Sequence, residues 1–312
     1  MFTRILVPLD GSPETNAALP LAAAMARATH ATIVLHRVIP SEEWTAESEI
    51  STREKLRRVA VELTGGGQPV EWLVTVGDPA PEILQQVYRS RADLVIMRTH
   101  GRSGVQRVVE GSVSEQVLAD CPVPIMLLKA GGHRVSHIRK LLVPIDGSPG
   151  GAAAVGTAAK FARTTGAAID LLQVVVPLAP FAAAYDGYME YDPGVDDAAL
   201  ASARTYAQHM SSRLQAAGLT VSGEARTVGD EPMNTAEAHR AIAATIVQAA
   251  DQHSADLIVM STHGLVGLKR ALLGSVADAV VRTAACPVLL IRRQVAEPES
   301  APTLESAGAI VE

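Results

Sequence analysis

The chain has 312 residues, of which 48% are hydrophobic and 19% charged, so it can bury the cores of about two domains. Its net charge of −6 and its aromatic content of 3% argue against a nucleic-acid-binding protein, which needs a basic surface and rings for stacking. Two cysteines provide neither a disulfide framework nor a paired-cysteine metal site.

Neither a signal peptide nor a membrane anchor is expected. The N-terminus reaches Asp10 after one short apolar run, without the longer apolar segment of a signal peptide. The longest apolar stretch, Leu171–Ala184, contains Gln173 and two prolines and is too short to span a bilayer. We therefore predict a cytoplasmic protein.

Along the first half, short apolar runs alternate with longer alanine-rich segments. This alternation is typical of parallel strands joined by crossover helices. The predicted strands are Arg4–Pro8, Thr32–Val38, Val70–Val76, Asp93–Met97 and Pro124–Leu128. We expect an α/β fold, with a five-stranded parallel sheet of order 3-2-1-4-5 flanked by helices.

Two helices are predicted to begin at a serine that is followed by a proline. Ser12 and Ser148 are placed as N-caps, with Pro13 and Pro149 at the first helical position, where a missing N–H costs nothing. Pro20 then falls inside the first helix and indicates either a kink or a later start of that helix.

The predicted last strand of the first half is approached through Pro122 and Pro124. Prolines remove donors from the hydrogen-bonded ladder. We therefore expect either that this strand lies at an edge of the sheet or that the prolines lie at its entrance. Two such edges, from two domains or two chains, can pair and protect one another.

The second half of the sequence repeats the first. Ile5–Pro13 returns as Leu141–Pro149, and Thr99–Val113 returns as Thr262–Val276. The second copy is longer between these blocks, with insertions expected around residues 177–200 and 231–240. We therefore predict two similar domains, 1–132 and 138–293, joined by a short linker. The tail at 294–312 carries four glutamates and no basic residue, and we expect it to be disordered.

The repeated blocks fall where open α/β sheets bind ligands, beyond the carboxyl ends of the strands. In each half a glycine and a serine, Gly111-Ser112 or Gly274-Ser275, follow a basic loop and open a predicted helix. Free backbone N–H groups, a hydroxyl and the positive end of a helix dipole suit a phosphate. The ligand expected here is an anionic molecule that carries a planar group.

These motifs together resemble those of the universal stress protein family. In the first half the resemblance is carried by Val7–Ser12, Val76–Pro79, and Gly101 with Gly111 and Ser112. In the second half it is carried by Val143–Ser148, Val228–Asp230, and Gly264 with Gly274 and Ser275. Two full sets in the same order make the chain similar to a tandem, two-domain member.

The resemblance implies that the chain binds ATP, with or without Mg²⁺, because ATP-binding members show the pattern Gly-x2-Gly-x9-Gly-Ser/Thr. Adenine would lie near Asp10 and Val38, or near Asp146 and Val174, with the ribose and phosphates along the glycine loop. The implied nucleotide-binding residues are Pro8, Asp10, Val38, Gly101, Gly111, Ser112 and Val113 in the first half, and Pro144, Asp146, Val174, Ser261, Gly264, Gly274, Ser275 and Val276 in the second.

The chain departs from that pattern at its first glycine, which is replaced by Arg98 in the first half and by Ser261 in the second. Where the position needs a positive φ or a close approach to the ribose, both residues are worse than glycine. The second site is then the safer prediction. Alternatively, Arg98 folds over the triphosphate and neutralises its charge.

Binding is expected rather than catalysis, and no catalytic or metal-ligating residue is assigned. The usual nucleotide-hydrolase and hydrolase motifs are missing. His100 and His263 repeat but have no evident nucleophile or carboxylate paired with them. Asp10 and Asp146 have a purely structural alternative, as turn residues that accept backbone N–H groups.

We thus expect a nucleotide-responsive regulator in the stress response that acts on a partner protein of unknown identity. The alternatives are a slow ATP hydrolase or phosphotransferase, and a nucleotide-free scaffold whose domains pair through edge strands. The resemblance also implies assembly through the last strands, either inside the chain or as a homodimer.

Overall fold

The computed structural model describes residues 1–12, 18–98, 113–129, 135, 137–178, 192–229, 233–262 and 274–292. The strands of the first half are β1 (Arg4–Leu9), β2 (Thr32–Ile39), β3 (Val70–Val76), β4 (Leu94–Arg98) and β5 (Ile125–Leu128). Its helices are α2 (Leu19–Thr29), the 3₁₀ turn η1 (Ser41–Glu43), α3 (Ala46–Gly65), α4 (Pro79–Arg89) and α5 (Val113–Asp120). The five predicted strands of this half are therefore present, with ends that shift by about one residue.

The second half repeats this series. Its strands are β6 (Lys140–Ile145), β7 (Ala168–Val175), β8 (Val221–Thr227), β9 (Leu257–Thr262) and β10 (Val288–Arg292). Its helices are α6 (Pro149–Thr165), α8 (Pro193–Ala216), α9 (Thr235–Gln252) and α10 (Ser275–Thr283). With 18 residues, α9 is longer than the 11-residue α4, in agreement with the insertion expected near residues 231–240.

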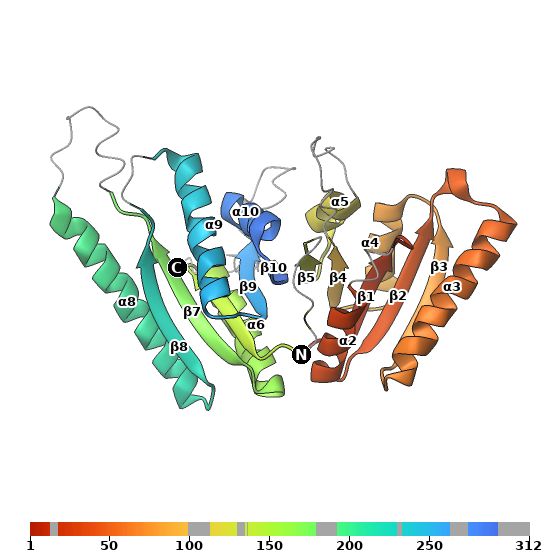
Figure 1. Cartoon of the computed structure of the whole chain (residues 1–312), viewed down its shortest axis with the longest axis horizontal. Coiled ribbons are helices and arrows are strands. Elements are labelled where there is room, and N and C mark those ends of the chain that lie inside the picture. Colours follow the sequence, from red (N-terminus) through yellow and green to blue (C-terminus); the bar gives the residue numbers. More distant parts are fainter. Residues whose placement is uncertain are drawn as a thin grey trace, which may run out of the picture.

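All ten strands belong to one sheet of order β3-β2-β1-β4-β5-β10-β9-β6-β7-β8 (Figure 1). Each half has the predicted order 3-2-1-4-5 with parallel neighbours, so the fold class is confirmed. The two sheets are joined into one where β5 pairs with β10 in antiparallel register, Met126 opposite Leu289. Pro122 and Pro124 precede β5 and stand at its entrance, and the expected pairing of two edges occurs inside the chain.

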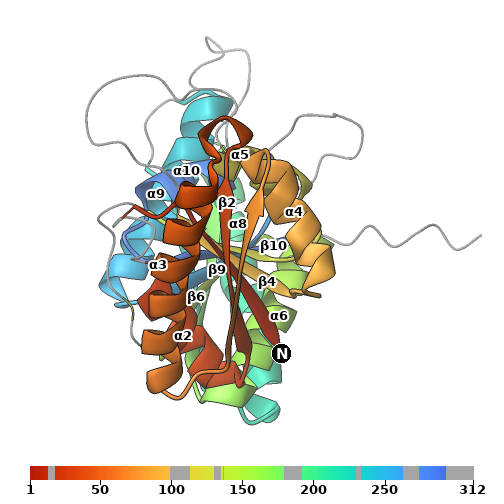
Figure 2. The ribbon, with the colours of Figure 1, turned by 90° about the vertical axis from the view of Figure 1, so that its right-hand side faces the viewer.

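Side chains of successive strand residues enter two different cores, because they point to opposite faces of the sheet. In β2, Ile33 and Leu35 pack on the face that carries α2 and α3, whereas Val34 and Val38 pack on the face that carries α4 and α5. Figure 2 shows α3 and α4 on opposite sides of the first-half strands. Both cores continue through the β5–β10 junction into the second half.

The helix starts agree only in part with the prediction. Helix α6 begins at Pro149, and the Ser148 hydroxyl accepts the Gly151 N–H at 3.1 Å, as expected of an N-cap. The described helix α2 begins at Leu19 with Pro20 in its first turn, and the residues that would distinguish a kink from a later start lie outside the described ranges. The predicted cap at Ser12 depends on residues 13–17, which lie outside the described residues.

Several sequence expectations fall on residues that the structure does not describe. The predicted tail at 294–312 and most of the linker lie outside the described ranges, as do Gly101, Gly111, Ser112 and Gly264. Among the described residues, no helix combines the length and the apolar character needed to cross a membrane.

Candidate functional site

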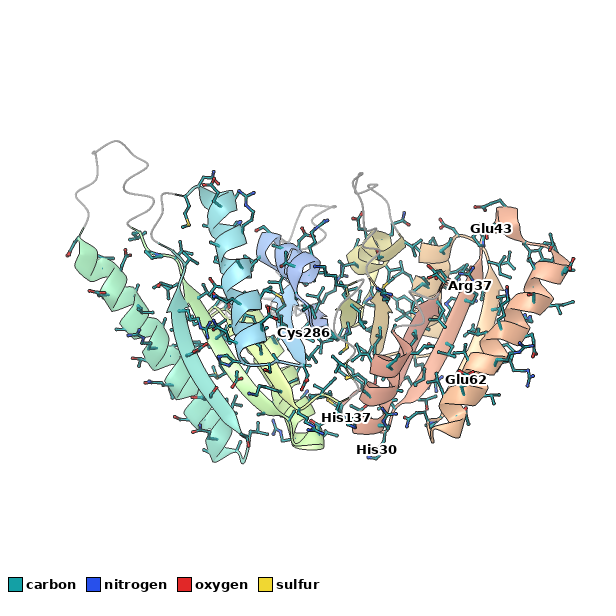
Figure 3. The ribbon with its side chains drawn as sticks, viewed as in Figure 1. His30, Arg37, Glu43, Glu62, His137 and Cys286 are labelled. Atoms are coloured by element: carbon teal, nitrogen blue, oxygen red, sulfur yellow. The ribbon has the colours of Figure 1, made fainter. Side chains whose placement is uncertain are left out.

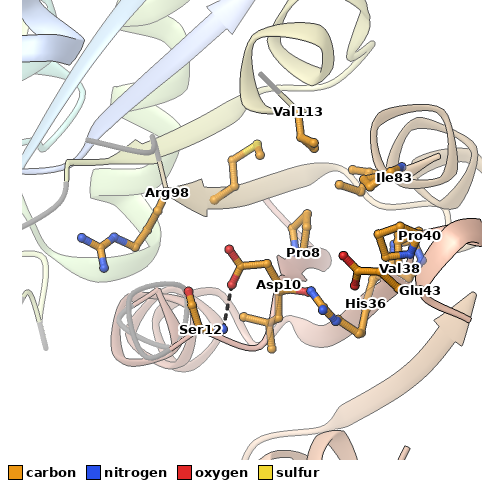
Figure 4. A pocket seen from close by; sticks show the side chains of 14 residues that line it. Pro8, Asp10, Ser12, His36, Val38, Pro40, Glu43, Ile83, Arg98 and Val113 are labelled. Carbon is orange, nitrogen blue, oxygen red and sulfur yellow. Dashed lines mark hydrogen bonds between the residues drawn. The ribbon is translucent and has the colours of Figure 1, made fainter. Parts of the chain in front are cut away.

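A cavity of about 460 Å³ opens at the carboxyl ends of the first-half strands (Figure 4). Its lining comprises Pro8, Leu9, Asp10 and Ser12 from β1 and the turn after it, His36, Arg37, Val38, Pro40 and Glu43 from β2 and η1, Pro79 and Ile83 from α4, Met97 and Arg98 from β4, and Val113 from α5. The order of strands reverses between β1 and β4, so the cavity stands at the switch point where open α/β sheets bind ligands.

The floor of the cavity is largely apolar. Val38 and Met97 belong to the core on the α4 and α5 face, and Ile83 of α4 packs in the same core. Pro8 is the register partner of His36 on the neighbouring strand, and both lie on this face. An apolar floor with a few polar groups at its edge suits a flat heterocycle.

Asp10 lies in the turn that follows β1. Its Oδ1 accepts the Ser12 N–H at 2.8 Å, and Gly11 between them has a φ of +80°, which glycine adopts without strain. In the second half, Asp146 Oδ1 accepts the Ser148 N–H at 2.9 Å across Gly147, whose φ is +75°. Both aspartates thus accept the turn N–H group that their structural alternative requires, and both side chains are exposed at the carboxyl end of the sheet, so the binding role stays a prediction.

Arg37 is a cavity residue that the sequence interpretation missed. Its guanidinium is half-buried, and its Nη1 donates to the Leu9 carbonyl oxygen at 3.3 Å. Burial lowers the pKa of Arg37, and the negative charges of Asp10 and Glu43 oppose this shift. Figure 3 shows Arg37 and Glu43 at the same end of the first half. The signal for Arg37 was a cation inside the largely apolar β2 segment, next to His36. Gln173 takes the place of Arg37 in β7.

His36 is the second residue that was missed. Its side chain is 0% exposed, and its Nε2 lies 2.9 Å from Thr75 Oγ1 on β3. Burial lowers the pKa of His36 to about 4, so the ring is neutral near pH 7. Leu172 takes this position in the second half, opposite Pro144 as His36 is opposite Pro8.

Arg98 and Val113 are the lining residues that flank the predicted phosphate loop in the sequence. Arg98 ends β4 and Val113 is the first residue of α5, so the lining includes a cation and the start of a helix. The loop between them, residues 99–112, lies outside the described residues. Both hypotheses for Arg98, as an obstacle or as a phosphate contact, therefore stay predictions.

In the second half, the described members of the predicted site lie near the end of β9 and at the start of α10. Ser261 belongs to β9 and is buried, Gly274 is the N-cap of α10, and Ser275 is the first residue of that helix. The Ser275 Oγ is 2.7 Å from Nδ1 of His239, which lies on α9. His239 was not predicted, because it belongs to the insertion that has no first-half counterpart.

The profile of the universal stress protein family matches residues 1–129 and 137–292. The chain belongs to the universal stress protein family. A universal stress protein of Mycobacterium tuberculosis is 25% identical over 307 residues, which are 93% of this chain and 97% of the relative. A universal stress protein of Thermus aquaticus is 33% identical over 138 residues, 41% of this chain and 100% of its own length.

A universal stress protein of Archaeoglobus fulgidus with a solved structure shares the tandem fold. It covers 93% of this chain and 96% of its own with a TM-score of 0.67, at 22% identity. Other solved universal stress proteins are in complex with cAMP and, for one from Archaeoglobus fulgidus, with dAMP. Their TM-scores of 0.36 and 0.34 over part of the chain carry no information on the geometry of the cavity described above.

Proposed function

We propose that this universal stress protein binds an adenine nucleotide, ATP with or without Mg²⁺, and acts as a nucleotide-responsive regulator. The observation that supports the proposal is the cavity of about 460 Å³ at the first-half switch point, with an apolar floor and charged groups at its edge. Its volume lies in the range of small-molecule sites, which is about 300–1,000 Å³.

The proposed orientation of the nucleotide follows the charges. The base lies on the apolar floor beside Val38 and Ile83, near Asp10. The phosphates extend towards Arg98 and the start of α5, where a cation and the positive end of a helix dipole favour negative charge. Gly101, Gly111, Ser112 and Val113 complete the proposed site.

A second nucleotide is proposed for the second half. Asp146 and Val174 would hold the base, and Ser275 with Val276 would meet the phosphates at the start of α10, together with Pro144, Ser261, Gly264 and Gly274. The His239 side chain reaches Ser275 and adds a polar group at this end. The two proposed sites differ most in the residue beneath the base, which is His36 in the first half and Leu172 in the second.

A metal ion would come with the nucleotide rather than with a site built into the chain. In the part of the chain that the structure describes, no three His, Cys, Asp or Glu side chains are grouped so that they could hold a metal ion. Mg²⁺ prefers phosphate oxygens and water in such a setting, and its role would be to neutralise the phosphate charge.

Regulation requires that the nucleotide bind two conformations of the protein unequally. Helix α5 leads directly into β5, and α10 leads directly into β10, the two strands that join the halves. Arg292 of β10 also donates to the carbonyl oxygens of Leu118 and Ala119 in the last turn of α5. Phosphates at the starts of α5 and α10 would thus act on the junction, and the partner that senses the change stays unidentified.

Isothermal titration of the full chain with ATP and with GTP tests the proposal. We expect heat with ATP at two sites, and the Asp10→Ala and Asp146→Ala variants should each remove about one site by loss of a charged acceptor. Glu54→Ala, which alters an exposed carboxylate of α3 paired with Arg57 and Arg58, is the control and should bind as the parent does. Absence of heat with ATP at high micromolar protein would refute the proposal.

A further inference from the structure

The imidazole of His36 is a buried polar group with one unused nitrogen. Its Nε2 lies 2.9 Å from the Thr75 hydroxyl, whereas its Nδ1 is buried and forms no hydrogen bond with any residue that the structure describes. The ring belongs to the wall of the first-half cavity and is 0% exposed. Buried side-chain nitrogens normally have a partner, and the described residues supply none to Nδ1, so a group that enters the cavity beside His36 is the candidate partner.

The Thr75 contact determines which nitrogen carries the proton. The ring is neutral near pH 7, because burial lowers its pKa to about 4, and it therefore holds one proton. A proton on Nδ1 would leave a buried N–H without an acceptor, which is rarer and more costly than a lone pair without a donor. The favoured tautomer has the proton on Nε2, which donates to Thr75 Oγ1, and leaves Nδ1 as an acceptor.

His36 stands at the base end of the proposed nucleotide. It shares the apolar face of the sheet with Val38 and Pro8, while Arg98 and the start of α5 mark the anionic end. The phosphates carry only acceptors, whereas the base and the ribose hydroxyls can donate. In the proposed orientation the base is the part of the nucleotide that lies beside His36, so we assign the donor to the base.

We infer that His36 selects the base at this site, by accepting a hydrogen bond from the exocyclic amino group of a 6-aminopurine and disfavouring a 6-oxopurine. The inference rests on the proposed function and names the residue that sets its base specificity. A 6-oxopurine would place a carbonyl lone pair against the Nδ1 lone pair and leave both unsatisfied. Leu172 accepts no hydrogen bond, so the second half lacks this means of selection.

Titration of the full chain with ATP and with ITP, which differ at the 6-position of the base, tests the inference. We expect the first site to prefer ATP by about tenfold, the effect of one well-formed hydrogen bond. The His36→Leu variant introduces the residue that the second half already holds at this place, and it should reduce the preference to about that of the second site. NMR of protein labelled with ¹⁵N-histidine tests the contact directly. The His36 Nδ1 resonance is identified by its absence in His36→Leu, and ATP should shift it in the parent.

Thr75→Val provides a second variant that leaves the imidazole in place. Without the hydroxyl, the ring is free to change tautomer, so the preference for ATP over ITP should fall while binding persists. Thr75→Ser keeps a hydroxyl and should retain the preference. Heat with ATP, together with an unmoved His36 Nδ1 resonance and an unchanged ATP-to-ITP ratio in His36→Leu, would overturn the inference and leave nucleotide binding intact. Absence of heat with both nucleotides would instead refute the proposed function on which the inference rests.

Discussion

The two halves share one topology but bury different polar side chains in the second strand of each half. In the first half, His36 lies near the carboxyl end of β2, under the cavity. In the second half, Asp170 lies near the amino end of β7, where the first half has Val34, and its carboxylate accepts Ser222 Oγ at 2.5 Å and contacts His253 Nδ1 at 2.9 Å. The repeated sequence gives both halves the same strand order, whereas single substitutions in the strands determine which polar side chains are buried.

The sharpest contrast between the halves concerns how closely a helix approaches the outer strand. The register places Trp72 of β3 opposite Leu35, and Gly223 of β8 opposite the equivalent Leu171. A Cβ at Gly223 would lie 2.5 Å from the Ala207 carbonyl oxygen of α8, so this helix packs directly on the strand backbone. The first half fills the same place with an indole.

Gly223→Ala is therefore expected to have the largest effect, a loss of about 3 kcal/mol in the free energy of unfolding of the second half, because backbone must move to admit the methyl group. Urea denaturation followed by circular dichroism measures the loss. Gly156→Ala in α6 is the matched control: nothing lies within 4 Å of its Cβ position, and it should stabilise slightly. Equal stability of Gly223→Ala and the parent would show that α8 is not packed as described.

The buried imidazole predicts a pH dependence that belongs to the first half alone. The pKa of His36 is about 4 in the folded protein and near 6.5 when unfolded, so below pH 6.5 the unfolded chain binds a proton that the fold excludes. Stability should therefore fall by about 2 kcal/mol from this residue between pH 7 and pH 5. Urea denaturation at the two pH values should show this loss in the parent and its absence in His36→Leu; an identical loss in both would contradict the assignment.

The polar cluster of the second half can be tested with the residue that the first half uses. Asp170→Val removes the acceptor shared by Ser222 and His253 and leaves both donors without it, so we expect a loss of about 1–3 kcal/mol. Val34→Ala, at the equivalent first-half position, tests loss of apolar packing alone. A neutral Asp170→Val variant would mean that the cluster contributes nothing to stability.

The smallest expected effect concerns the helix start that follows the aspartate turn. Ser148→Ala removes the cap on Gly151 N–H and should cost about 1 kcal/mol, as at other N-caps. Ser148→Asp keeps an acceptor and should restore stability. The measurement is again urea denaturation, and unchanged stability in Ser148→Ala would indicate that the α6 N-terminus is satisfied by other groups.

Much of this architecture could be predicted from the sequence because its signals are local or repeated. The Asp-Gly-Ser turns, the Ser148 cap and the alternation of strands and helices each depend on neighbouring residues. His36 and Arg37 could not be identified in this way, because a polar residue inside a strand joins the cavity only through its register with β1 and the position of α4. His239 was missed for another reason: its contact with Ser275 depends on how far the lengthened α9 extends.

The β5–β10 junction has a consequence for how such a protein can change over time. When two identical chains associate, every substitution appears on both sides of the symmetry axis. Here the covalently linked copies meet through Ile125–Leu128 and Val288–Arg292, so each mutation alters one copy only. A linked pair can therefore acquire two unequal halves from a single gene, with an imidazole at one position of β2 and an isobutyl group at the equivalent position of β7.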